Sequence, residues 1–187
     1  MIEFLKAIDL RLFLFFNGNH TPFMDSVMGF ASNKYAWIPL YLLFLFFVWK
    51  KSKSRMWLVA LSVAILITFS DQISVHLFKE TFQRYRPCHN LLLKDKVQLI
   101  NGECGGTYGF VSSHAANTFA LITFLSLYFR RKDFAFSMYI WAAFVAYSRV
   151  YAGVHYPFDV LGGMFLGMIL GVIGYKIYKN LDKKYAI

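Results

Sequence analysis

Two histidines and a nearby carboxylate are the residues of this sequence whose types and spacing suit catalysis. Asp159 follows His155 by four residues, with Pro157 between them, and proline is favoured in the first turn of a helix. A carboxylate at this spacing reaches the imidazole ring, fixes its tautomer and stabilises the imidazolium form. We therefore expect His155 to be a nucleophile oriented by Asp159, and His114 to be the general acid and base.

Three cations and a pair of serines indicate that the group attacked is a phosphate. An arginine fork matches two phosphate oxygens, and a cation at membrane depth is costly unless it binds an anion. The start of a helix adds free N–H groups that also favour an anion. The expected phosphate-binding residues are Lys79, Arg86, Ser112, Ser113 and Arg149.

This set of side chains suits phosphoryl transfer through a phosphohistidine on His155. The cations would stabilise the charge on the equatorial oxygens of the transferring group. A histidine and an aspartate four residues apart could instead bind a metal on a helix. The same three cations would repel a metal and attract a phosphate, so we expect no metal and no cofactor.

The elements that must position these residues are membrane-spanning helices. The 187 residues are 58% hydrophobic and 20% aromatic, which is more apolar surface than a soluble domain of this size can bury. The sequence predicts an all-α, integral-membrane bundle of about five transmembrane helices, in a single domain across residues 1–187. Gly163, Gly167 and Gly171 predict close helix packing in the last of them. The apolar segments are Tyr35–Trp49, Met56–Val75, Ala115–Phe129, Phe134–Tyr147 and Val160–Tyr175.

Basic residues predict the orientation of this bundle. Eleven of the twenty lysines and arginines lie in three clusters after apolar runs, at Lys50–Arg55, Arg130–Lys132 and Lys176–Lys184. One topology places all three clusters in the cytoplasm, as the positive-inside rule requires. Residues 79–113 then form an extracytoplasmic loop, and the active site faces the periplasm or exterior of a bacterial inner membrane. The net charge of +10 therefore reflects orientation and does not indicate nucleic-acid binding.

The N-terminal segment, residues 1–33, lies on the outer side in this topology. Met1–Phe16 mixes apolar and charged positions, which is typical of an interfacial amphipathic helix. Phe23–Phe30 is too short to cross a membrane alone, so it either dips into the membrane or extends the first span. No cleavable signal peptide is visible, because charges precede a first apolar run that is short.

The polar loop contains both cysteines of the chain. Cys88 and Cys104 are expected to form a disulfide, since an extracytoplasmic compartment permits one. Two inert thiols are the alternative, and a zinc site would need more ligands at closer spacing. For Arg84 the two interpretations are contact with phosphate or lipid headgroups and, as the favoured one, an interfacial anchor. We interpret His20 and His89 as surface residues.

The arrangement resembles the type 2 phosphatidic-acid phosphatase family, which includes bacterial undecaprenyl-diphosphate phosphatases and is related to the vanadium haloperoxidases. The family pattern is Lys-x6-Arg-Pro, then Pro-Ser-Gly-His, then Ser-Arg-x5-His-x3-Asp. The first and third elements match in full, at Lys79–Pro87 and Ser148–Asp159. In the middle element Val111 and Ser113 replace the usual proline and glycine, which affects the backbone of that turn and not the identity of the acid. The resemblance implies metal-independent hydrolysis through a phosphohistidine, at a site that also binds vanadate.

These motifs recognise phosphate and leave the rest of the substrate open. Because the chain is short and has no large added extracytoplasmic domain, we expect an undecaprenyl-diphosphate phosphatase. The alternatives are a lipid A phosphatase and a phosphatidylglycerol-phosphate or phosphatidate phosphatase. A lipid-phosphate transporter is the non-enzymatic alternative, and it would show inverted repeats and broken helices at mid-membrane. The expected partners are the lipid phosphate or diphosphate and the bilayer, with no nucleic acid and no obligate protein partner evident.

Overall fold

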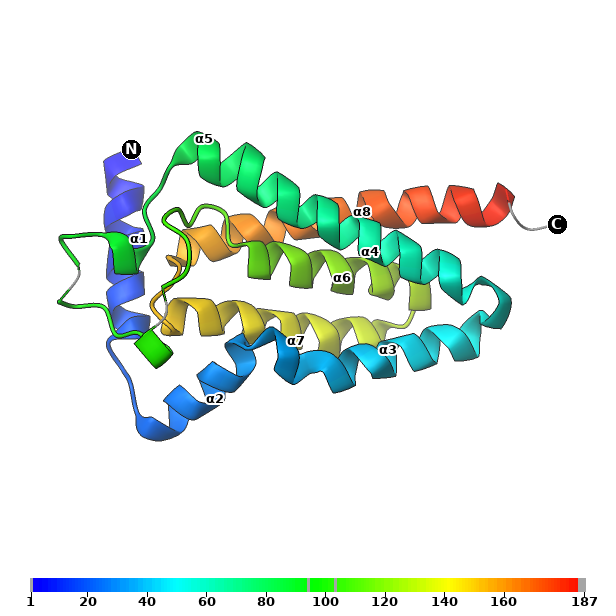
Figure 1. Ribbon diagram of the computed structural model, residues 1–187, viewed down its shortest axis with the longest axis horizontal. Coiled ribbons are helices and arrows are strands. Elements are labelled where there is room, and N and C mark those ends of the chain that lie inside the picture. The colour runs from blue at the N-terminus through cyan, green and yellow to red at the C-terminus, as the bar shows by residue number, and fades with distance from the viewer. Residues whose placement is uncertain (1, 94, 103, 185–187) are drawn as a thin grey trace.

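Helices build the architecture of this protein, as the sequence predicts. The computed structural model describes residues 2–93, 95–102 and 104–184, and these residues contain no β-strand, although Tyr85 and Tyr108 form one isolated bridge. Five helices run side by side along the long axis of the molecule (Figure 1). They are α3 (Ile38–Lys51), α4 (Met56–Gln72), α6 (Ser113–Phe129), α7 (Lys132–Tyr151) and α8 (Pro157–Lys184).

These five helices coincide with the five apolar segments of the sequence. The helical segment Lys53–Phe82, which contains α4, and α8 are each long and apolar enough to cross a membrane. The helix pair Pro22–Ser32 and Lys34–Lys51 meets the same criteria as a single span bent by 68°. α6 is shorter, at 17 residues, and packs against α4, α7 and α8. The bundle is therefore that of an integral membrane protein.

α8 has one face of small residues and an opposite face of large apolar residues. Gly163, Gly167 and Gly171 are buried against α6, where a methyl group on any of them would collide with atoms of α6 or of its N-cap. This confirms the prediction of close helix packing. The opposite face leaves large apolar side chains exposed, as a face in contact with lipid requires: Leu161, Phe165, Ile169, Ile173 and Ile177.

The N-terminal helix α1 (Ile2–Asn17) lies across one end of the bundle instead of along it (Figure 1). Its last residue, Asn17, is fully buried. The Asn17 amide donates hydrogen bonds to the carbonyl oxygens of Gln98 and Tyr151, both at 2.8 Å, and its oxygen accepts one from the Gln98 N–H. These bonds fix the end of α1 to the polar loop and to the end of α7.

α2 (Pro22–Ser32) leads the chain from α1 back to the bundle. Thr21 caps its N-terminus, and Pro22 occupies the first turn. At Asn33 the chain leaves α2 and forms a 3₁₀ turn, η1 (Lys34–Trp37), which leads into α3. Phe23–Phe30 therefore belongs to a helix that extends the first span through a bend.

His20 lies between α1 and α2 and is mostly covered. Its imidazole stacks on the Tyr151 ring with centroids 4.2 Å apart, and its Nδ1 lies 2.8 Å from Oδ1 of Asp25. The interpretation of His20 as a surface residue is therefore wrong, because the loop that carries it folds onto the end of α7. His89 is exposed, as predicted.

The two ends of the bundle differ in charge and in structure. The α3–α4 and α6–α7 connections and the end of α8 lie at the end opposite α1 (Figure 1), and these segments carry the three basic clusters. At the α1 end, the polar loop of residues 79–113 begins with a short helix, α5 (Glu80–Phe82), and leads into α6. The loop contains two single 3₁₀ turns, η4 (Pro87–His89) and η5 (Ile100–Gly102).

Candidate active site

Four helices bring the predicted site residues to the α1 end of the bundle. Lys79 ends a π-helical turn, η3 (Ile73–Lys79), that continues α4, and such turns are frequent at functional sites. His114 lies in the first turn of α6, and Arg149 lies in the last turn of α7. Asp159 lies in the first turn of α8. Residues of all three motifs therefore lie at the same end of the bundle, although Lys79 and Asp159 are 80 residues apart in the sequence.

A cavity of about 550 Å³ opens among these helix ends. Three of the predicted catalytic and phosphate-binding residues line it: Arg86, His114 and Arg149. Its volume suits a small ligand or the headgroup of a larger one. The bend between α2 and α3 supplies another part of the wall, which the motifs do not reveal: Ser32, Asn33, Lys34 and Tyr35.

His155 and Asp159 are buried beside this cavity and do not form its walls. Nδ1 of His155 lies 3.5 Å from Oδ2 of Asp159, which exceeds the usual hydrogen-bond length but is close enough for the carboxylate to stabilise an imidazolium when one forms. The same carboxylate oxygen accepts a hydrogen bond from the Tyr156 N–H at 3.0 Å. An acidic residue at the third helical position commonly reaches back to the N-cap in this way. The start of α8 therefore places the carboxylate beside the ring, as the four-residue spacing predicts.

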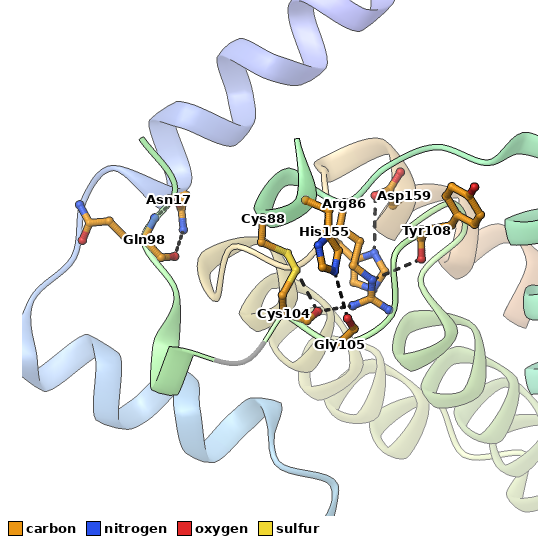
Figure 2. The surroundings of a disulfide bond; sticks show 10 residues. Asn17, Arg86, Cys88, Gln98, Cys104, Gly105, Tyr108, His155 and Asp159 are labelled. Carbon is orange, nitrogen blue, oxygen red and sulfur yellow. Dashed lines mark hydrogen bonds and ion pairs between the residues drawn. A yellow bond between two sulfur atoms is a disulfide. The ribbon is translucent and has the colours of Figure 1, made fainter. Parts of the chain in front are cut away.

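Arg86 is held by the polar loop (Figure 2). Its guanidinium donates hydrogen bonds to the carbonyl oxygens of Cys104, at 3.1 Å, and Tyr108, at 3.3 Å. A disulfide joins Cys104 to Cys88, with the Cα atoms 5.9 Å apart. The disulfide therefore links the segment around Cys104, which orients Arg86, to Cys88, two residues after Arg86.

Lys79 is held by serines. Its ammonium donates a hydrogen bond to the Ser113 hydroxyl at 2.7 Å, and that hydroxyl also lies 2.5 Å from the Ser74 hydroxyl. Ser113 stands where the family pattern has glycine. The structure therefore gives Ser113 a contact with a cation of the phosphate-binding set.

Ser112 and Arg149 complete the predicted set. Ser112 is fully buried and caps α6, with its hydroxyl facing the Ala115 N–H at 3.5 Å. Its own N–H donates to the Asp159 carbonyl oxygen at 2.9 Å, which ties the start of α6 to the start of α8. Arg149 donates to the hydroxyl of Ser32, at the bend between α2 and α3.

Burial and positive charge keep His155 neutral. Burial lowers the pKa of His155 well below its ordinary value of 6.5, and the charges of Arg86, Arg149 and Lys79 lower it further. Burial also lowers the pKa of Arg86, which the charge of Asp159 opposes, and a guanidinium remains protonated at neutral pH. An uncharged imidazole surrounded by cations has a lone pair available for attack on a phosphate.

Gly109 is a site residue that sequence reasoning misses. A methyl group on its Cα would lie 2.9 Å from Oδ2 of Asp159, 3.2 Å from Cγ of Arg86 and 3.5 Å from Nδ1 of His155. The backbone there passes so close to three site residues that a side chain does not fit. In the sequence it is a glycine two residues before the middle motif, and no pattern there predicts the crowding.

Arg84 lies against two buried carboxylates and not at the membrane interface that the sequence predicts. It forms ion pairs with Asp159 and with Asp9 of α1, so the interpretation as an interfacial anchor is wrong. Its partners lie 75 residues away on either side, and no local pattern reveals them.

The motifs and the fold identify the family. The model of the PAP2 superfamily matches residues 55–183. The chain belongs to the PAP2 superfamily. The PAP2 match contains every predicted catalytic and phosphate-binding residue, and it leaves out α1, α2 and α3.

Individual PAP2 relatives cover most of the chain. A lipid A 4'-phosphatase of Bacteroides thetaiotaomicron is 39% identical over 98% of this chain and 83% of its own length. An undecaprenyl-diphosphatase of Sulfolobus acidocaldarius is 28% identical over 91% of this chain and 79% of its own length. The crystal structure of Aquifex aeolicus LpxE superimposes with a TM-score of 0.65 at 27% identity, covering 89% of this chain and 94% of that one. The family and these relatives support a membrane phosphatase, that is, a phosphoric-ester hydrolase.

Proposed function

We propose that this PAP2 protein removes a phosphate from lipid A through a phosphohistidine on His155. The observation that carries the reaction is the neutral, buried His155 beside Asp159, next to a cavity lined by Arg86, His114 and Arg149. Support for the substrate comes from the relative named a lipid A 4'-phosphatase, at 39% identity over nearly the whole chain.

This proposal corrects the substrate that the sequence favours. Undecaprenyl diphosphate is less well supported, because the Sulfolobus acidocaldarius undecaprenyl-diphosphatase is 28% identical, compared with 39% for the lipid A 4'-phosphatase. The physical reason for the error is that the motif residues handle a phosphate group, which all the candidate lipids share. Undecaprenyl diphosphate, phosphatidylglycerol phosphate and phosphatidate remain as alternative substrates.

The geometry supports a two-step reaction. Nε2 of His155 attacks phosphorus, the bond from phosphorus to the lipid oxygen breaks, and His114 gives that oxygen a proton. Asp159 stabilises the charge that develops on the His155 ring. His114 then takes a proton from a water molecule that attacks the phosphohistidine, which releases inorganic phosphate and regenerates neutral His155.

Three cations make this chemistry feasible without a metal. Arg86 and Arg149 line the cavity, Lys79 bonds Ser113 at the start of α6, and the charges of all three lower the pKa of His155. They can therefore stabilise negative charge that builds up on a phosphoryl group there. We therefore propose metal-independent hydrolysis, with no cofactor. The N–H groups at the start of α6 would add to the same binding site.

We further propose that residues 1–187 form one domain in a bacterial inner membrane, with the active site and residues 79–113 outside the cytoplasm. The three basic clusters at the opposite end of the bundle support this orientation. The site residues gather at one end of the helices and not at mid-membrane. This arrangement favours a phosphatase over a lipid-phosphate transporter.

The test of function is phosphate release by the purified protein in detergent from lipid A, undecaprenyl diphosphate, phosphatidylglycerol phosphate and phosphatidic acid. We expect the highest kcat/KM on lipid A, full activity in excess EDTA and inhibition by orthovanadate. His155→Ala should abolish turnover, and His114→Ala should slow it. Turnover by His155→Ala within tenfold of the unmodified protein would refute the mechanism, and a need for a divalent ion would refute metal independence.

The test of orientation is cysteine labelling in intact cells, in a protein that lacks Cys88 and Cys104. Leu92→Cys, in the polar loop, should react with a membrane-impermeant maleimide. Asp133→Cys, at the basic end, should react only after the membrane is permeabilised. Both positions are highly exposed, so accessibility does not limit either reaction. The reverse pattern would place the active site in the cytoplasm.

A further inference from the structure

Arg84 connects two buried carboxylates at the active site. One guanidinium nitrogen donates to Oδ1 of Asp159 at 2.7 Å, and another donates to Oδ2 of Asp9 at 2.6 Å. Both carboxylates are fully buried, while the Arg84 side chain is about one quarter exposed. Charge-assisted bonds of this length between buried groups are strong and directional.

The remaining atoms of this network fix it to the start of α8. Oδ1 of Asp9 accepts a hydrogen bond from the Phe158 N–H at 2.9 Å. The Arg84 guanidinium also lies over the Tyr156 ring, 4.1 Å from its centroid. Two residues therefore hold the turn that carries His155 and Asp159. Asp9 binds its backbone at Phe158, and Arg84 contacts the Tyr156 ring and the Asp159 carboxylate.

The two oxygens of Asp159 have different partners. Arg84 occupies Oδ1, which leaves Oδ2 for the Tyr156 N–H and for the side facing His155. Rotation of the carboxylate would break the bond to Arg84. Because the two oxygens are equivalent, the network fixes the plane of the carboxylate, with one oxygen towards Arg84 and the other towards the nucleophile.

We propose that Arg84 and Asp9 are positioning residues for phosphoryl transfer, which hold Asp159 in the orientation that supports His155. This inference rests on the proposed function of His155. It also gives α1 a second role: besides lying across the end of the bundle, α1 supplies a buried carboxylate to the site. Asp9 lies outside residues 55–183, the region that matches the family model, so it is a contribution of the N-terminal segment.

The experiment compares Arg84→Gln and Asp9→Asn with the unmodified protein, on whichever lipid phosphate that protein hydrolyses. Each variant should lower kcat by roughly 100-fold, as a displacement of about 1 Å at a reacting group does. The KM should change by less than about threefold, because neither residue is in the phosphate-binding set. The double variant should be no slower than Arg84→Gln alone, because both changes disable one network.

Arg55→Gln is the matched control. Arg55 pairs with Asp182 at 3.0 Å at the opposite end of the bundle, so this variant also removes an arginine–aspartate pair. It should leave kcat unchanged. Thermal unfolding of each variant, measured in the same detergent, separates loss of fold from loss of rate. If Arg84→Gln does not fold, the kcat and KM of the nearly isosteric variant Asp9→Asn test the inference by the same criteria.

The inference is overturned if kcat stays within about threefold, if the loss appears in the KM, or if Arg55→Gln lowers kcat as much. His155→Ala distinguishes this failure from failure of the proposed function. An inactive His155→Ala together with a fully active Arg84→Gln rejects only the positioning role. An active His155→Ala rejects the function on which the role depends.

Discussion

Replacing Gly109 by alanine would add a single methyl group at the centre of the candidate active site. The new carbon would lie 2.9 Å from Oδ2 of Asp159, whereas ordinary contacts begin at 3.4 Å. The carboxylate or the loop must therefore move by 0.5 Å, which is 3.4 − 2.9. Gly109 has no positive φ angle, so the substitution acts through this collision and not through backbone strain.

The size of the effect follows from this displacement. A displacement of about 1 Å in a catalytic group costs about 100-fold in rate, so half of it should lower kcat roughly 10-fold, or about 1.4 kcal/mol in the barrier. The KM should change little, because the methyl group disturbs Asp159 more than it disturbs the cations that hold phosphate. The assay is phosphate release at saturating lipid substrate, with thermal unfolding to confirm the fold.

Gly106→Ala is the matched control in the same loop. A methyl group on Gly106 meets no described atom within 4 Å, and this glycine also has no positive φ angle. Its kcat should equal that of the unmodified protein. The reasoning is refuted if Gly109→Ala keeps kcat within twofold, or if Gly106→Ala loses as much activity as Gly109→Ala does.

Three further predictions concern the surroundings of the site. Ser113→Gly should tighten vanadate binding roughly fivefold, because the ammonium of Lys79 no longer donates a hydrogen bond worth about 1 kcal/mol to the hydroxyl; weaker binding would show that the hydroxyl itself binds phosphate. Cys88→Ser should lower the free energy of unfolding by roughly 3 kcal/mol, as expected for a disulfide between residues 16 apart in the sequence. An unchanged melting temperature, together with two free thiols in the unmodified protein, would show that the bond to Cys104 does not form. Because the pKa of His155 is lowered on folding, the unfolded chain binds the proton first, and stability should fall as the pH drops below about 6.5. The fall should be smaller in His155→Gln. Identical melting profiles of the two proteins from pH 8 to pH 5 would contradict the lowered pKa.

The parts of the site that follow from the sequence depend on spacing along one helix. Asp159 lies beside His155 because both belong to one turn at the start of α8, and proline marks that turn. The glycine stripe of α8 is also a periodic pattern, and so are the apolar runs that become the five helices. Local periodicity of this kind is visible in a single sequence.

The parts that do not follow depend on contacts between distant segments. The sequence predicts a surface cation at Arg84 because its partners, Asp9 and Asp159, are 75 residues away in each direction. Gly109 reads as an ordinary loop glycine, since the crowding around it exists only after folding. The cavity wall at Ser32 and Lys34 requires a bend between two helices, and no motif marks it.

The glycine stripe of α8 has a consequence for chemistry as well as for packing. Gly163 is its member nearest the site, and a methyl group there would lie 2.5 Å from the Ser112 carbonyl oxygen. The N–H of the same serine donates to the Asp159 carbonyl oxygen, so the starts of α6 and α8 are joined at this level. The stripe therefore acts as a spacer that sets the distance between the helix carrying His114 and the turn carrying His155. A larger residue at Gly163 would separate acid from nucleophile without touching either, and would slow proton delivery to the leaving group while the phosphate still binds.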